Sequence, residues 1–145
     1  MSVNVVKVET RKQLKKFIRF NYELYKDCPY SVPELYEDTM NTLRKDRNAA
    51  FEFCDADYFL AYRDGEIVGR IAAIINRRAN EKWGHNAVRF GWVDFIDDKE
   101  VADAIGARCV FYGGGSHDPS RLNGLAPVAM SLTDAVEAAL RLSQS

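Results

Sequence analysis

The sequence lacks the features that mark membrane and nucleic-acid-binding proteins. Its longest apolar run, residues 71–75 (IAAII), is far shorter than the roughly 20 residues of a membrane-spanning helix. No apolar segment of the secretory-signal type follows the first residues. The balance of 20 basic against 21 acidic residues gives no basic excess to attract nucleic acid or an anionic membrane, although a local patch stays open. We therefore expect no membrane and no nucleic-acid partner.

Cysteine and histidine are also scarce. The three cysteines, Cys28, Cys54 and Cys109, are odd in number and show no C-x-x-C spacing, and the two histidines are His85 and His117. This pattern matches neither a zinc site nor a disulfide framework. We expect reduced thiols, a cytoplasmic location and no metal.

Lysine is missing from one part of the chain. The 145 residues are 47% hydrophobic and 28% charged, values typical of one globular domain. All eight lysines lie within residues 1–102, and residues 103–145 have none. We expect a single domain over residues 1–145, with an atypical C-terminal segment at 103–145. An origin of that segment by fusion or frameshift is an open alternative.

The N-terminal part predicts a strand followed by two helices. Alternating valines indicate a strand over 3–9, and Thr10 is a suitable N-cap for a helix over 11–26. A second helix is expected to begin at Ser31 or Pro33 and to end near 45.

The middle of the chain predicts a β-hairpin and a third strand. Asp64-Gly65 is a type I′ turn signal between strands at 58–63 and 66–76, and the second of these is apolar on both faces and therefore central. The next elements expected are a polar loop over 77–85, a strand over 88–96, and a short helix to 105 with Asp97 as its N-cap and Glu100 at its third position.

The tail predicts a strand at 107–112, a glycine run and a final helix at 131–143. Gly113, Gly114 and Gly115 follow that strand directly. Glycines let the backbone approach an anion closely, so this run is either a phosphate-binding nest or a simple turn.

The order of elements and several phrases resemble the GNAT superfamily of acyl-CoA-dependent N-acyltransferases over residues 3–105. The phrases are PYSVPEL at 29–35, YFLA at 58–61, DGEIVGRIAAIIN at 64–76 and VRFGWVDFIDD at 88–98. The resemblance implies an α/β (α+β type) fold with a GNAT-like mixed, mostly antiparallel sheet of five to six strands flanked by helices. It also implies acetyl-CoA or another acyl-CoA as acyl donor, with a small-molecule or protein amine as acceptor.

The resemblance also implies roles for three neighbouring residues. Backbone groups of Phe95 and Ile96 would hold the pantetheine arm, and Asp94 would deprotonate the amine. By strand alternation Asp94 shares a face with Phe90, Trp92 and Ile96, where aromatic surroundings would raise its pKa. The alternative is a structural ion pair between Asp94 and Arg70 or Arg89.

The sequence departs from the family where the CoA pyrophosphate usually binds. The family has a glycine-containing loop at the helix start that follows the fourth strand, whereas this chain has Asp97, Asp98 and Glu100 there. These carboxylates would repel a pyrophosphate. The expected substitute is the backbone of Gly113, Gly114 and Gly115. The alternative is a non-catalytic GNAT-like domain that has lost the CoA site.

A second, weaker resemblance concerns the tail. Residues 105–140 are similar to the last βαβα unit of haloacid-dehalogenase-like hydrolases. The pair Asp55 and Asp57 is similar to the two catalytic aspartates of that family, but it lies in mid-chain and Tyr58 follows it. We expect these aspartates to lie in a turn that enters a strand.

Overall fold

The chain divides into two compact units, residues 1–105 and 106–145. The structure, a computed structural model, describes residues 2–105, 111–112 and 128–129. In the second unit strands β5 (Phe111–Tyr112) and β6 (Val128–Ala129) pair in parallel. The glycine run and the helix predicted at 131–143 lie outside the described residues.

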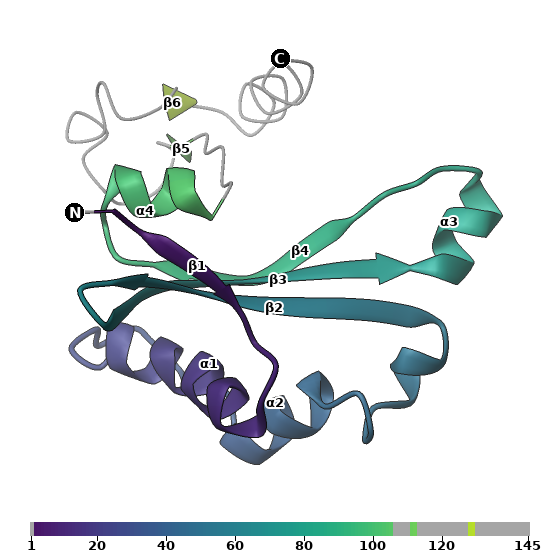
Figure 1. Ribbon diagram of the computed structural model, residues 1–145, viewed down its shortest axis with the longest axis horizontal. Coiled ribbons are helices and arrows are strands. Elements are labelled where there is room, and N and C mark those ends of the chain that lie inside the picture. The colour runs from purple at the N-terminus through teal and green to yellow at the C-terminus, as the bar shows by residue number, and fades with distance from the viewer. Residues whose placement is uncertain (1, 106–110, 113–127, 130–145) are drawn as a thin grey trace. The chain divides into compact units, whose positions relative to one another are not determined.

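The first unit is built on a four-stranded antiparallel sheet in the order β1-β2-β3-β4 (Figure 1). Its strands are β1 (Asn4–Lys7), β2 (Cys54–Arg63), β3 (Glu66–Asn76) and β4 (Arg89–Phe95). The mixed α and β class and the interior place of residues 66–76 are confirmed. The described residues contribute four strands to this sheet, rather than five or six.

The hairpin between β2 and β3 forms as its turn sequence predicts. Asp64 and Gly65 both have positive φ, 52° and 80°, which is the backbone of a type I′ turn. β2 begins at Cys54, earlier than predicted, so Asp55 and Asp57 lie within the strand and not in a turn. Asp55 forms an ion pair with Arg77, and Asp57 forms ion pairs with Lys7 and Lys45.

Two helices cover one face of the sheet (Figure 1). Helix α1 (Arg11–Leu24) begins at the predicted N-cap, where Thr10 and Gln13 form a capping box. Helix α2 (Tyr36–Leu43) begins later than predicted. Phe17 and Ile18 of α1 and Leu43 of α2 are almost fully buried against Leu60 of β2. This packing forms the hydrophobic core.

The polar loop predicted at 77–85 is wrong, because these residues form helix α3 (Arg77–Trp83). Asn76 caps its N-terminus, and Gly84 ends it in the left-handed conformation at φ 63°. The residues between β2 and α2 also include a short 3₁₀ helix, η1 (Ala49–Glu52). Local capping therefore makes a helix from a stretch with little apolar periodicity.

Helix α4 (Lys99–Ala104) lies on the sheet face opposite α1 and α2 (Figure 1). Its N-cap is Asp98 and not the predicted Asp97, since the Asp98 carboxylate accepts from the N–H groups of Glu100 and Val101. α4 packs closely on β3: a Cβ added to Gly69 would lie 3.1 Å from Val101 and 3.2 Å from Phe95. Gly69 therefore sets how near α4 approaches.

Strand β4 contains a β-bulge. Between the pairs Ala72–Gly91 and Arg70–Asp94, β3 has one residue and β4 has two, Trp92 and Val93. Trp92 has φ 46°, a left-handed conformation that is rare for a bulky residue. The bulge changes which residues of β4 share a face from this point on.

Candidate functional site

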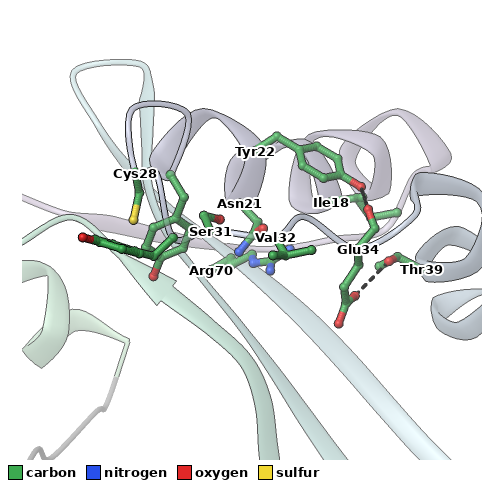
Figure 2. A pocket seen from close by; sticks show the side chains of 11 residues that line it. Ile18, Asn21, Tyr22, Cys28, Ser31, Val32, Glu34, Thr39 and Arg70 are labelled. Atoms are coloured by element: carbon green, nitrogen blue, oxygen red, sulfur yellow. Dashed lines mark hydrogen bonds between the residues drawn. The ribbon is translucent and has the colours of Figure 1, made fainter. Parts of the chain in front are cut away.

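A cavity of about 360 Å³ lies where the end of α1 and the following segment meet the sheet (Figure 2). Residues from α1, the segment to α2, α2 itself and β3 line it. They are Ile18, Asn21, Tyr22, Tyr25, Cys28, Tyr30, Ser31, Val32, Glu34, Thr39 and Arg70. In Figure 2 Glu34 and Thr39 lie at one end of the view and Cys28 at the other, with Arg70 and Asn21 between them.

Arg70 is a buried arginine whose nitrogens all donate within the protein. Its Nε and Nη2 contact Oδ2 of Asp94 at 2.8 and 2.6 Å, and its Nη1 donates to the Phe17 carbonyl at 2.9 Å. Only 6% of the Arg70 side chain and 13% of the Asp94 side chain are exposed. The guanidinium also lies over the Phe17 ring, 5.1 Å from its centre. This pair fixes β3, β4 and α1 relative to one another.

Asp94 accepts two more hydrogen bonds from α1 and the residue after it. Asn21 Nδ2 donates to Oδ2 at 3.2 Å, and the Tyr25 hydroxyl donates to Oδ1 at 3.0 Å. Burial, and secondly the Asp94 charge, raise the pKa of Tyr25. Tyr25 thus stays a neutral phenol at neutral pH, with its proton directed to Asp94.

Of the roles expected for Asp94, the structure shows the ion pair with Arg70. The prediction of an aromatic face around Asp94 is wrong for Phe90, which pairs with Ala73 and so lies on the opposite face, 75% exposed. The bulge at Trp92 causes this change. Asp94 does not line the cavity; its partners Arg70, Asn21 and Tyr25 do. Any effect of Asp94 on a ligand there passes through them.

Phe95 and Ile96 differ in what their backbone groups can bind. The Ile96 N–H donates to the Val68 carbonyl at 3.0 Å, and its carbonyl accepts from Asp98 at 2.7 Å. Both groups are therefore engaged. Because antiparallel pairs alternate, the backbone groups of the preceding residue, Phe95, point away from β3. Among residues 2–105 β4 is an edge strand, so these Phe95 groups meet no strand there.

The start of α4 is occupied by the protein's own carboxylate. Asp98 caps the helix and also pairs with Arg63 at 2.7 Å, and Glu100 lies 3.4 Å from the same guanidinium. The bond to Arg63, and then the two N–H groups of α4, lower the pKa of Asp98 to about 2. A pyrophosphate at this position would have to displace Asp98. The predicted substitute, Gly113 to Gly115, lies outside the described residues.

The sequence interpretation missed the side chains that line the cavity. It named neither Tyr25 nor Glu34 as a functional residue. A signal was present: Tyr22, Tyr25 and Tyr30 cluster around the break between two helices, and an aromatic-rich helix end is a common wall for a ligand. What could not be read from spacing was that Asp94, far along the chain, orients Tyr25.

Other kinds of site are not formed by the described residues. Within residues 2–105 no group of three or more His, Cys, Asp or Glu side chains is placed to hold a metal ion. No helix in the described part of the chain has the length and apolar character needed to cross a membrane. Cys28 and Cys54 are free thiols.

Comparison with known proteins gives partial similarities. No protein-family model matches the chain, and no solved structure gives a significant match. Protein YghO from Escherichia coli (strain K12) is 34% identical over 95 residues, which are 66% of this chain and 24% of that protein. A bacterial ceramide synthase from Caulobacter vibrioides is 29% identical over 104 residues, 71% of this chain and 27% of the synthase. The chain thus spans about a quarter of the length of these relatives.

Proposed function

We propose that this chain takes part in N-acyl transfer, from an acyl-CoA to an amine. The observation that carries the proposal is the hydrogen-bonded series Tyr25–Asp94–Arg70 at a cavity wall, directly beside the outward-facing backbone of Phe95. The Caulobacter relative adds support, because a ceramide is an amide and its synthesis forms an N-acyl bond.

The acyl donor fits the edge of β4, which pairs with no further strand among residues 2–105. The pantetheine arm of CoA contains amide groups, and amides add to an exposed strand edge by backbone hydrogen bonds. Phe95 offers one such N–H and one carbonyl, whereas Ile96 has both groups engaged. We therefore assign pantetheine binding to Phe95 alone. Binding of the pyrophosphate by Gly113, Gly114 and Gly115 stays a prediction.

In the proposed reaction the amine nitrogen attacks the thioester carbonyl. The new N–C bond forms, the C–S bond breaks, and CoA leaves as a thiolate that takes up a proton from solvent. The nitrogen gives a proton to the Tyr25 oxygen while the Tyr25 proton moves to Asp94. Asp94 is then a positioning group that accepts the proton through Tyr25, instead of the direct base that the sequence predicted.

A non-catalytic domain is the second candidate, and one observation favours it. Asp98 already satisfies the free N–H groups at the start of α4, and Arg63 pairs with Asp98 and Glu100. The family's usual pyrophosphate position is therefore filled by the chain itself. A domain that has lost CoA binding would show this arrangement.

Calorimetric titration of the chain with acetyl-CoA and CoA separates the two candidates. Binding at micromolar concentrations contradicts the non-catalytic domain. No heat at millimolar concentrations contradicts acyl transfer. Mass spectrometry of the chain incubated with acyl-CoA and a panel of amines then detects the amide product directly.

The Tyr25→Phe variant tests the proton path. General acid–base groups typically contribute about 10²–10⁴-fold in rate, so we expect a loss of at least about 10²-fold in amide formation. Tyr36→Phe is the matched control, since the buried Tyr36 hydroxyl has no hydrogen-bond partner among the described residues and does not line the cavity. Equal rates for the two variants would exclude Tyr25 from the reaction.

A further inference from the structure

Several polar side chains of the cavity donate hydrogen bonds within the protein and keep acceptor atoms free. At one side the Tyr25 hydroxyl and the Asn21 amide donate to Asp94. Tyr25 keeps the lone pairs of its oxygen, and Asn21 keeps its side-chain oxygen and one amide N–H. Both oxygens can accept a hydrogen bond from a ligand.

The other side of the cavity also has free hydrogen-bond acceptors. The Tyr22 hydroxyl donates to the Glu34 backbone carbonyl at 2.6 Å, and the Thr39 hydroxyl lies 2.9 Å from Glu34 Oε2, to which it donates. Figure 2 shows both contacts as dashed lines. The Glu34 carboxylate keeps its second oxygen for a ligand and has only acceptor capacity. The hydroxyls of Ser31 and Tyr30, which also line the cavity, make no side-chain hydrogen bond with the described residues and can both donate and accept.

The charges around the cavity also favour a cationic ligand. The Arg70 guanidinium is paired with Asp94, and each of its nitrogens already donates to Asp94 or to Phe17. Glu34 makes no ion pair with another described residue, and its carboxylate adds negative charge to the cavity wall. The faces of Tyr22, Tyr25 and Tyr30 are also electron-rich, which favours a cation.

We propose that this cavity binds a primary ammonium group, with Glu34 as its counter-ion and the Tyr25 and Asn21 oxygens as further acceptors. An ammonium has three donors and no acceptor, so it can bond to Glu34, Tyr25 and Asn21 together. This inference rests on the proposed function, because it identifies the cavity as the binding site of the amine that accepts the acyl group. It places that nitrogen beside Tyr25: the ammonium first gives one proton to solvent, and the neutral amine then gives a second proton to Tyr25 as it attacks.

Binding of hexylamine without any acyl-CoA tests the proposal on the intact chain. Three probes share the six-carbon chain: hexylamine carries charge and N–H donors, hexyltrimethylammonium carries charge only, and hexanol has no charge. By chemical-shift titration at neutral pH we expect hexylamine to bind about tenfold more tightly than either control probe, because charge-assisted hydrogen bonds are the strong ones. Equal or tighter binding of hexanol overturns the proposal.

Glu34→Gln removes the charge and keeps the shape of the side chain. We expect it to weaken hexylamine binding by about tenfold and to leave hexanol unchanged. Glu37→Gln is the matched control, because Glu37 is an exposed acid in the first turn of α2 that does not line the cavity. Thermal unfolding of both variants checks that they fold. An unchanged hexylamine affinity in Glu34→Gln overturns the proposal.

The failure of this inference is distinguishable from failure of the proposed function. Amine binding that depends on Glu34, without amide formation from any acyl-CoA, contradicts acyl transfer and keeps the ammonium site. Amide formation with an amine whose affinity and rate do not change in Glu34→Gln keeps acyl transfer and overturns the ammonium site.

Discussion

Two of the arginine–aspartate pairs in the first unit, one bonded to α1 and one at the start of α4, differ in burial. Arg70 and Asp94 have side chains 6% and 13% exposed, whereas Arg63 and Asp98 have 21% and 28%. The buried pair has hydrogen-bond partners from α1 on both of its members. The more exposed pair caps a six-residue helix.

The difference shows how burial decides what an ion pair does. A buried charge is expensive to leave unpaired, so Arg70 and Asp94 depend on each other and on α1 for a single geometry. A solvated pair costs little to separate, so Arg63 and Asp98 influence the local charge more than the stability. The first pair therefore defines the cavity wall, and the second defines which ligands the start of α4 excludes.

Breaking the buried pair should have the largest effect. Arg70→Met leaves Asp94 buried without its counter-ion and the Phe17 carbonyl without its side-chain donor, and we expect a loss of about 3–5 kcal/mol in the free energy of unfolding. Urea unfolding followed by circular dichroism measures it.

The double variant Arg70→Met with Asp94→Leu is the control for this prediction. Replacing both charges by apolar groups of similar size is often close to neutral, so the double variant should be more stable than the single one. A single variant that loses less than about 1 kcal/mol would place this pair in the class of surface ion pairs.

Adding a methyl group where α4 packs on β3 should have an intermediate effect on stability. Gly69→Ala pushes a methyl group against Val101 and Phe95, and overpacking of this kind typically costs about 1–3 kcal/mol. Gly91→Ala is the matched control, because its added Cβ would meet only Ile74 at 3.8 Å, an ordinary contact. Chemical denaturation of both variants should separate them, and equal midpoints would mean that α4 adjusts freely.

The smallest effect is expected for the more exposed pair, and it depends on pH. The pKa of Asp98 is about 2 in the folded state against 3.8 without its partners. A lowered pKa stabilises the folded state above the higher value, and this contribution is lost as pH falls from 3.8 towards 2. Asp98→Asn keeps an N-cap side chain but removes the charge, so the stability difference from the parent should shrink across that window.

Asp97→Asn is the control for the pH experiment. Asp97 is the neighbouring carboxylate and makes no ion pair with another described residue. Thermal unfolding from about pH 5 to about pH 2 should show the window for Asp98→Asn, and Asp97→Asn is measured beside it as a variant that removes a charge but no described ion pair. Parallel curves for the parent and Asp98→Asn would show that the Arg63 contact adds no pH dependence.

The elements that the sequence predicted well carry their signals locally. Asp64-Gly65 specifies its turn through backbone conformation alone, and Thr10 specifies the start of α1 through one hydrogen bond. Helix α3 was missed because its signals, Asn76 and Gly84, are caps at the ends of a stretch with no apolar stripe to accompany them.

The candidate site was predictable in part. Pairing of Asp94 with Arg70 was one of two alternatives, and the register of β3 and β4 selects it. The positions of Tyr25 and Asn21 around Asp94 depend on how α1 packs across the sheet, which no local pattern encodes. Strict alternation along β4 predicts the wrong face of the sheet for Phe90, because the bulge at Trp92 adds one residue to the strand.

The extra residue in β4 keeps two parts of the strand on the same face although an odd number of positions separates them. Gly91 and Asp94 are three positions apart, yet they oppose Ala72 and Arg70, which share a face of β3. Removing one residue from positions 92–93 would therefore restore strict alternation and leave Asp94 opposite Arg70 and Phe95 opposite Gly69. A single-codon deletion within the bulge would preserve the ion pair, whereas the same deletion elsewhere in β4 would move the following side chains to the other face.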